Sequence, residues 1–170
     1  GAWLVEPEFR RDERGFFART WCQEEFAVHG VNATFRQTSV SHNARKATLR
    51  GMHYQIVPHA EAKLVSCVRG AIYDVIIDVR PDSPTYCQWI EVELTAHRLP
   101  IIVPFKMLYI PEGFAHGFQT LEDDTLVFYQ MSEFYYPQSA RGIRWDDPIF
   151  AIEWPIHDKI ISDKDRSYGI

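Results

Sequence analysis

Hydrophobic residues in this chain occur in short runs and not in long helical stretches. The runs are rich in Val, Ile, Tyr and Phe, and many alternate apolar with polar positions. Gly, Pro, Asp and Ser separate them, which is typical of strands joined by turns. This pattern predicts eight strands, at residues 33–41, 48–55, 62–68, 70–79, 88–95, 107–110, 115–120 and 125–134. Their spacing favours an all-β jelly roll or barrel, because no long amphipathic helices intervene.

Helices are expected only as short peripheral pieces. Residues 23–28 suit one, because Glu24 and Glu25 place acidic side chains in its first turn. The last thirty or so residues hold Trp145 and Trp154 among prolines, which predicts irregular chain packed back over the barrel. No repeat, low-complexity tract or linker divides the sequence. We therefore expect residues 1–170 to form one domain.

Composition and charge exclude several classes of protein. With 46% hydrophobic and 14% aromatic residues, the chain has enough apolar surface for a core. A net charge of -5 and a pI near 5.8 give no basic excess of the kind that binds nucleic acid. Three widely spaced cysteines suit neither a disulfide framework nor a CxxC metal site. Without a signal-peptide layout or a membrane-length apolar run, we expect a cytoplasmic protein with no membrane or nucleic-acid partner.

Arg50 and His53 fall in one predicted strand, within the segment LRGMHYQ. Because they are three residues apart, a regular strand would turn their side chains to opposite faces. A bulge would let both line one cavity, and Gly51 between them is the residue type that permits a bulge. Alternatively, His53 is a core histidine and Arg50 a surface charge, and this segment alone leaves both interpretations open.

Four other residues could carry chemistry but also have a structural interpretation. A proline and two glycines frame His116 at the mouth of a strand, where backbone or a ligand can approach closely, yet its phenylalanine neighbours also suit a structural histidine. Lys63 and Asp74 interrupt apolar strands, so each is either solvated or buried for a purpose. Tyr129, taken without context, reads as a core residue.

Metal-dependent and nucleophilic chemistry find no matching motif. A metal site in a barrel of this kind needs two histidines one residue apart on a strand, followed by a carboxylate and a further histidine. This chain instead offers His53 and His59, the second of them after Pro58 in an expected loop. Nucleophile-elbow, P-loop and GxGxxG patterns do not occur. We therefore expect no metal.

Eight motifs, in order along nearly the whole chain, resemble the dTDP-4-dehydrorhamnose 3,5-epimerase family of the cupin superfamily. They are DERGFF at 12–17, LRGMHYQ at 49–55, KLV at 63–65, VRGAIYD at 68–74, SPT at 83–85, PEGFAHGF at 111–118, RWDDP at 144–148 and SDKD at 162–165. The resemblance implies a homodimeric jelly-roll barrel that inverts carbons 3 and 5 of a nucleotide-linked 4-keto-6-deoxyhexose without metal or cofactor.

Catalytic roles follow from the resemblance at four positions. His53 resembles the general base, and Asp165 the carboxylate that orients it. Tyr129 occupies the place of the tyrosine that returns a proton from the opposite ring face. Lys63 resembles the residue that stabilises the enolate oxygen. The chemistry needs these groups, because both C–H bonds flank the C4 ketone and become acidic only if the developing charge is stabilised.

The resemblance also implies substrate-binding positions. Arg14 resembles the residue that reaches across the dimer to the nucleotide, Arg50 would contact the diphosphate or sugar, and His116 with Asp74 would line the sugar pocket. The full expected set is Arg14, Phe17, Arg19, Gln37, Arg50, Asp74, His116, Phe134 and Lys164.

Departures from the family pattern leave the substrate open. Arg19 stands where a DxRGxFxE pattern has an acid, and Phe134 where a tyrosine often stacks on thymine. The chain is longer than usual between Ala96 and Pro111, including an apolar stretch at 99–104. The alternatives are a 3-epimerase of a different nucleotide sugar, a non-catalytic sugar-nucleotide-binding barrel, and a metal-dependent cupin enzyme.

Overall fold

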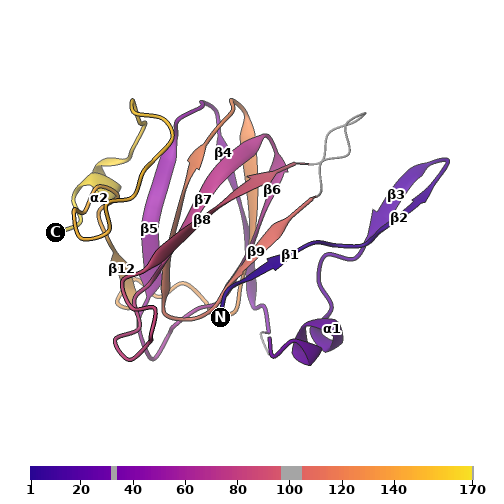
Figure 1. Cartoon of the computed structure of the whole chain (residues 1–170), viewed down its shortest axis with the longest axis horizontal. Coiled ribbons are helices and arrows are strands. Elements are labelled where there is room, and N and C mark those ends of the chain that lie inside the picture. Colours follow the sequence, from indigo (N-terminus) through magenta and orange to yellow (C-terminus); the bar gives the residue numbers. More distant parts are fainter. Residues whose placement is uncertain (32–33, 97–104, 170) are drawn as a thin grey trace.

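The fold, seen in a computed structural model that describes residues 1–31, 34–96 and 105–169, is a jelly-roll barrel of two facing antiparallel sheets (Figure 1). In sheet order, the first holds β1 (Trp3–Val5), β9 (Met107–Ile110), β6 (Lys63–Arg69), β11 (Thr125–Met131) and β4 (Gln37–Asn43). The second holds β12 (Ala140–Gly142), β5 (Leu49–Gln55), β10 (Phe114–Thr120), β7 (Ala71–Asp78) and β8 (Trp89–Thr95).

The main core lies between the two sheets. It is built from side chains that alternate inward along the strands, such as Val65 and Val127 from the first sheet and Ile72, Ile76 and Phe118 from the second. All five are at most 1% exposed. Burying them removes apolar area from water at roughly 25 cal/mol per Å², which is the main force closing the barrel. The two sheets are thereby held at a distance at which their inner faces can share one pocket.

A second apolar cluster covers the outer face of the second sheet. Val75 and Ile77 of β7 are fully buried there, against Ile143, Phe150 and Trp154 of the C-terminal segment. The indole N–H of Trp154 donates to a backbone oxygen, as the N–H of a buried indole requires. This confirms that the last residues pack over the barrel. It also explains why β7 is buried on both faces, since protein covers each of them.

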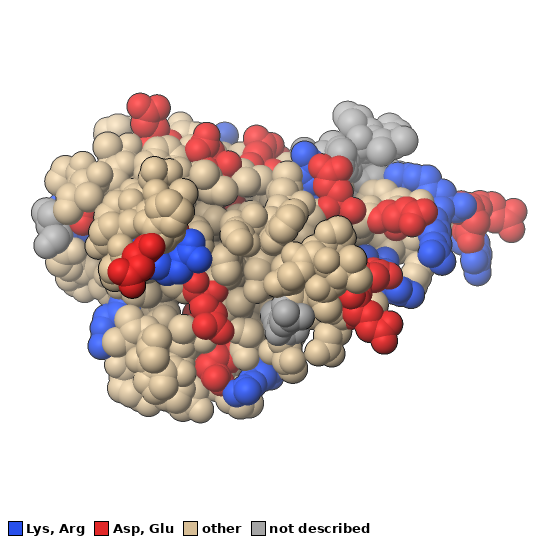
Figure 2. All heavy atoms as spheres, turned by 60° about the horizontal axis from the view of Figure 1, so that its bottom comes forward, with Lys and Arg blue, Asp and Glu red and all other residues tan. Residues whose placement is uncertain are grey.

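The N-terminal part extends away from the barrel. Strands β2 (Phe9–Asp12) and β3 (Gly15–Ala18) form a two-stranded hairpin that projects to one side, with α1 (Gln23–Val28) below it (Figure 1). Figure 2 shows side chains of both charges crowded at the same end of the molecule. The predicted helix at 23–28 is confirmed.

Each of the eight predicted strands has a counterpart, and the differences lie at their ends. The strand predicted at 33–41 begins at Gln37, and Ala33 falls outside the described residues. The strand predicted to reach residue 134 stops at Met131, because its two neighbours begin opposite that point, at Gln37 and Lys63. Prediction missed β1, β2, β3 and β12, which have only three or four residues each. The apolar stretch at 99–104 lies outside the described residues.

No described helix is long and apolar enough to cross a membrane.

Candidate active site

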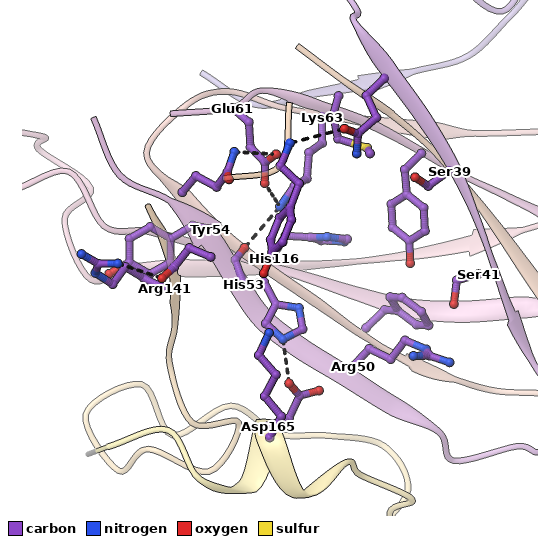
Figure 3. A pocket seen from close by; sticks show the side chains of 18 of the residues that line it. Ser39, Ser41, Arg50, His53, Tyr54, Glu61, Lys63, His116, Arg141 and Asp165 are labelled. Atoms are coloured by element: carbon purple, nitrogen blue, oxygen red, sulfur yellow. Dashed lines mark hydrogen bonds and ion pairs between the residues drawn. The ribbon is translucent and has the colours of Figure 1, made fainter. Parts of the chain in front are cut away.

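A cavity of about 490 Å³ opens between the two sheets (Figure 3). Eight of the residues singled out from the sequence line it. They are Gln37, Arg50, His53, Lys63, His116, Tyr129, Lys164 and Asp165. His53 and His116 come from the second sheet, whereas Lys63 and Tyr129 come from the first, so charged and polar groups enter the cavity from both sides.

His53 and Asp165 form a close pair. The Nε2 atom of His53, on β5, lies 2.7 Å from Oδ1 of Asp165, on the short helix α2 (Asp163–Arg166) (Figure 3). The other carboxylate oxygen accepts the backbone N–H of Gly51 at 3.3 Å, and the Ser162 hydroxyl accepts the N–H of Asp165 at 3.1 Å. The carboxylate is therefore fixed on both sides and in turn fixes the imidazole ring.

The Asp165 carboxylate keeps its negative charge. Burial by itself would raise its pKa, but the hydrogen bond and the charge of His53 and the N–H of Gly51 more than offset this, so that the pKa lies below its ordinary value. An ionised carboxylate accepts hydrogen bonds and cannot donate them. Nε2 of His53 therefore carries the proton that joins the pair. The lone pair of the neutral ring is then on Nδ1, which is free to take a proton.

Of the two interpretations of this segment, the structure shows the one with a bulge between Arg50 and His53. Pairing of β5 with β10 shifts between Phe118 opposite Arg50 and His116 opposite His53, so three steps along β5 match two along β10. Both side chains thereby reach the same cavity. Gly51 has a φ of 122°, and a Cβ atom there would lie 2.5 Å from Cα of Gly117. Glycine at 51 and 117 thus allows two backbones to touch at this point.

Lys63 enters from β6 with its ammonium already bound. Its Nζ lies 3.0 Å from Oε1 of Glu61 and 3.3 Å from the backbone oxygen of His53 (Figure 3). The amide of Gln55 donates to the second carboxylate oxygen of Glu61 at 3.3 Å. Lys63 is 9% exposed, and a buried ammonium is tolerable only when paired in this way. The positive charge of Lys63 is thus held beside the backbone of His53.

The phenol of Tyr129, on β11 of the first sheet, is partly buried. Burial raises its pKa well above the ordinary value, and the negative charge of Asp74 raises it further. A hydrogen bond with Ser41 and the charge of Arg50 oppose these effects without cancelling them. At neutral pH the phenol therefore carries its proton.

Asp74 does not line the cavity. It lies behind His116, fully buried, with its Oδ1 atom 2.7 Å from Nε2 of the histidine. His116 itself is 5% exposed and faces the cavity, where its ring lies edge-on to that of Tyr129 at 6.2 Å between centroids. Asp74 thus acts on the cavity through the orientation of His116 and through its charge.

The structure places the other sequence-derived candidates elsewhere. Arg14 and Phe17 lie on the projecting hairpin, with Arg14 paired to Asp12. Arg19 follows the hairpin and pairs with Glu25 at 2.6 Å. Phe134 is 49% exposed and lies beside the guanidinium of Arg36, outside the cavity wall. That these residues bind substrate stays a prediction.

Several wall residues were missed from the sequence, among them Ser41, Tyr54, Glu61, Arg141 and Tyr168. Glu61 left a usable signal, because it is two positions from Lys63 and two is the spacing of side chains on one face of a strand. Tyr168 left none, since its approach to His53, at 5.9 Å between ring centroids, depends on the path of the C-terminal segment. Within the described residues, no group of three or more His, Cys, Asp or Glu side chains is arranged to hold a metal ion.

Proteins of one known family are similar to this chain in both sequence and fold. The family model described as dTDP-4-dehydrorhamnose 3,5-epimerase matches residues 1–169. The chain is also 42% identical, over 163 residues, to the dTDP-4-dehydrorhamnose 3,5-epimerase of Shigella flexneri. That alignment covers 95% of this chain and 86% of the Shigella protein.

Solved structures give the same result. The dTDP-4-dehydrorhamnose 3,5-epimerase of Bacillus anthracis, with TDP and PPi bound, superposes with a TM-score of 0.93 at 41% identity, covering 99% of this chain and 93% of that one. The 3'-monoepimerase ChmJ of Streptomyces bikiniensis, in complex with dTDP-quinovose, gives a TM-score of 0.87 at 33% identity and covers 99% and 82%. These matches confirm the expected cupin-type jelly roll, and the chain belongs to the dTDP-4-dehydrorhamnose 3,5-epimerase family.

Proposed function

We propose that this protein is an isomerase that inverts carbon 3, carbon 5 or both of a dTDP-linked 4-keto-6-deoxyhexose, by proton transfers through an enolate. One observation carries this more than any other. An imidazole oriented by a carboxylate and a protonated phenol line the same cavity from facing sheets. Inversion needs a base and an acid on opposite faces of the sugar ring, and two facing sheets can supply them.

His53 is the base. Its Nδ1 takes the proton from the carbon next to the ketone, and the ring becomes an imidazolium that Asp165 stabilises at 2.7 Å. General-base catalysis of this kind is worth roughly 10²- to 10⁴-fold in rate. Because α2 anchors the carboxylate through Ser162, the imidazole is held in place before substrate arrives.

Lys63 stabilises the enolate. When the C–H bond breaks, negative charge moves onto the C4 oxygen, and an ammonium placed beside it lowers the barrier. Glu61 and the backbone oxygen of His53 hold that ammonium close to the base. Because the cavity wall around Lys63 is largely shielded from water, the interaction is stronger there than at the surface.

Tyr129 is the acid. It gives its proton to the other face of the planar enolate, which completes the inversion. The resulting phenolate is then neutralised from solvent, while His53 loses the proton it took. One base and one acid serve both carbons, since each of the two carbons flanks the same ketone.

Cationic residues at the cavity can bind the diphosphate of the nucleotide. Arg50 and Lys164 both line it and are exposed enough to meet a diphosphate. The relatives support a dTDP sugar as substrate, since the Bacillus anthracis structure holds TDP and PPi and the Streptomyces bikiniensis structure holds dTDP-quinovose. The first is named a 3,5-epimerase and the second a 3'-monoepimerase, so the family includes both outcomes at the two carbons.

Proton NMR in deuterium oxide tests the function. With dTDP-4-keto-6-deoxyglucose we expect loss of the signals from both ring protons that flank the ketone and appearance of the inverted sugar. Loss of one signal only identifies a single-centre epimerase. UDP- and GDP-linked 4-keto sugars, as matched controls, should react more slowly. A purified protein that binds the dTDP sugar but exchanges neither proton would be a binding barrel and would refute the proposal.

The complete site belongs to a homodimer in which Arg14 serves the neighbouring copy. The projecting hairpin leaves Arg14 and Phe17 exposed and away from the cavity of their own chain, where a second copy could receive them. We therefore expect dimers by light scattering. Arg14→Ala should raise KM for the dTDP sugar by about tenfold or more, the cost of losing one charge-assisted contact to phosphate. Glu13→Ala, in the same exposed turn, is the matched control and should leave KM unchanged.

Mixed dimers separate sharing between copies from a role within one chain. In a dimer of one Arg14→Ala chain and one His53→Asn chain, the site that keeps His53 receives the intact Arg14 of its neighbour. If the hairpin reaches across, these dimers recover the wild-type KM at half of the sites. A KM as high as that of pure Arg14→Ala dimers, or a fully active monomer, would contradict sharing.

A further inference from the structure

The inner face of β4 carries a row of short polar side chains. Ser39, Ser41 and Asn43 alternate along this edge strand, and neighbouring β11 places Tyr129 opposite Ser39 and Val127 opposite Ser41. Ser41 is therefore the diagonal neighbour of Tyr129 on the same face of the sheet, within reach of a long aromatic side chain. Both Ser41 and Tyr129 line the cavity, and the Ser41 side chain acts on the phenol by lowering its pKa.

Asn43 fixes this part of the strand. It is 2% exposed, and its amide donates to the backbone oxygens of Thr125 and Ser41, each at 3.3 Å. Its Oδ1 atom accepts two hydrogen bonds, from Nε of Arg50 at 2.7 Å and from the Ser41 hydroxyl at 3.4 Å. Arg50 and Ser41 thus both donate to the buried amide oxygen of Asn43, which fixes the positions of their side chains relative to each other.

These contacts give the Ser41 hydroxyl a direction. While its own proton points to Asn43, its oxygen is free to accept the phenol proton of Tyr129. A serine hydroxyl rotates to suit its partners, and the bond to Asn43 is long, so little is lost when it turns. Once Tyr129 has given its proton to the substrate, the same hydroxyl can donate to the phenolate oxygen, and hydrogen bonds to an ionised group are about twice as strong as neutral ones.

We propose that Ser41 is a positioning residue for the acid of this reaction, holding the Tyr129 phenol before proton transfer and donating a hydrogen bond to the phenolate after it, with Asn43 holding Ser41 in place. The inference rests on the proposed acid role of Tyr129. It adds that the acid depends on β4, the edge strand of the first sheet, whereas the base lies on the second sheet. It also gives a reason why Asn43 is buried although it lies outside the cavity.

Ser41→Ala tests the inference, with product formation and solvent-deuterium exchange measured on the same sample by proton NMR. We expect product formation to fall about 10- to 100-fold, the effect of losing one hydrogen bond to a charged group, while exchange on the His53 side stays within about threefold. Ser41→Cys, nearly the same size but a weak donor, should behave like Ser41→Ala. Ser41→Thr, which keeps the hydroxyl and suits a strand, should restore product formation.

Ser39→Ala is the matched control, because Ser39 faces the same way on the same strand and is directly opposite Tyr129. Its ratio of product to exchange should equal that of the wild type. A wild-type ratio in both Ser41→Ala and Ser41→Cys would overturn the inference, and so would an equal loss of product and exchange, which indicates a purely structural role. If Tyr129→Phe itself keeps full turnover, the acid assignment has failed and the inference with it. That result is distinct from a failure of Ser41 alone.

Discussion

Replacing His53 with Asn is expected to abolish both product formation and solvent-deuterium incorporation, with turnover lowered by at least about 10³-fold. Asparagine keeps a hydrogen-bonding group near Asp165, so the fold and the position of the carboxylate should persist. It has no nitrogen that can take a proton at neutral pH. Without a base no enolate forms, and neither carbon next to the ketone exchanges.

Proton NMR in deuterium oxide measures this result directly, because exchange reports the first proton transfer whether or not inversion follows. His157→Asn is the matched control, since the His157 side chain is fully exposed and, among the described residues, pairs with that of its neighbour Asp158. It should behave as the wild type. Undiminished exchange in His53→Asn would remove this residue from the base role, and the same cavity would need another base.

Tyr129→Phe is expected to separate the two halves of the reaction. Product formation should fall by at least about 100-fold, because the enolate has no acid on its second face. Exchange should continue within about tenfold, since His53 can still remove a proton and return a deuteron to the same face. Phenylalanine fills the same space against His116 and Phe118, so the barrel should stay folded.

Tyr54→Phe is the informative control for this variant. Tyr54 also lines the cavity but comes from β5, the strand that carries His53. A phenol on that strand belongs to the second sheet, like the base, and we expect its loss to leave the ratio of product to exchange unchanged. Full turnover in Tyr129→Phe would refute the acid assignment. If Tyr54→Phe instead showed exchange without product, the acid would be Tyr54.

Local pattern was sufficient for most of the fold. Short apolar runs, many with period two, predicted eight of the described strands, because the alternation of side chains across a strand is a property of the backbone itself. The segment also offered a bulge between Arg50 and His53 as one of two interpretations, since Gly51 lies between two residues of opposite parity. Four of the five described strands of three or four residues, β1, β2, β3 and β12, were missed because so few positions show no recognisable period.

The sequence identified the residues of the candidate site less completely than it identified the fold. Lys63 and Asp74 stood out because they interrupt apolar strands, which left open whether each is solvated or buried for a purpose, and Tyr129 alone reads as a core residue. Only the resemblance to a family gave the three their functional roles. Glu61, Ser41 and Asn43 were missed altogether. Their importance comes from the neighbour each one contacts, and a single sequence carries no record of which side chains meet.

The sequence by itself determined the fold class, eight of the strands and, through eight ordered motifs, the family. Only the tertiary structure decided which groups face each other. Asp165 is 112 residues from His53 along the chain yet 2.7 Å away in space, and Tyr129 reaches the same cavity from the opposite sheet. Strand periodicity depends on neighbouring residues, whereas these contacts depend on how the two sheets close over their common core.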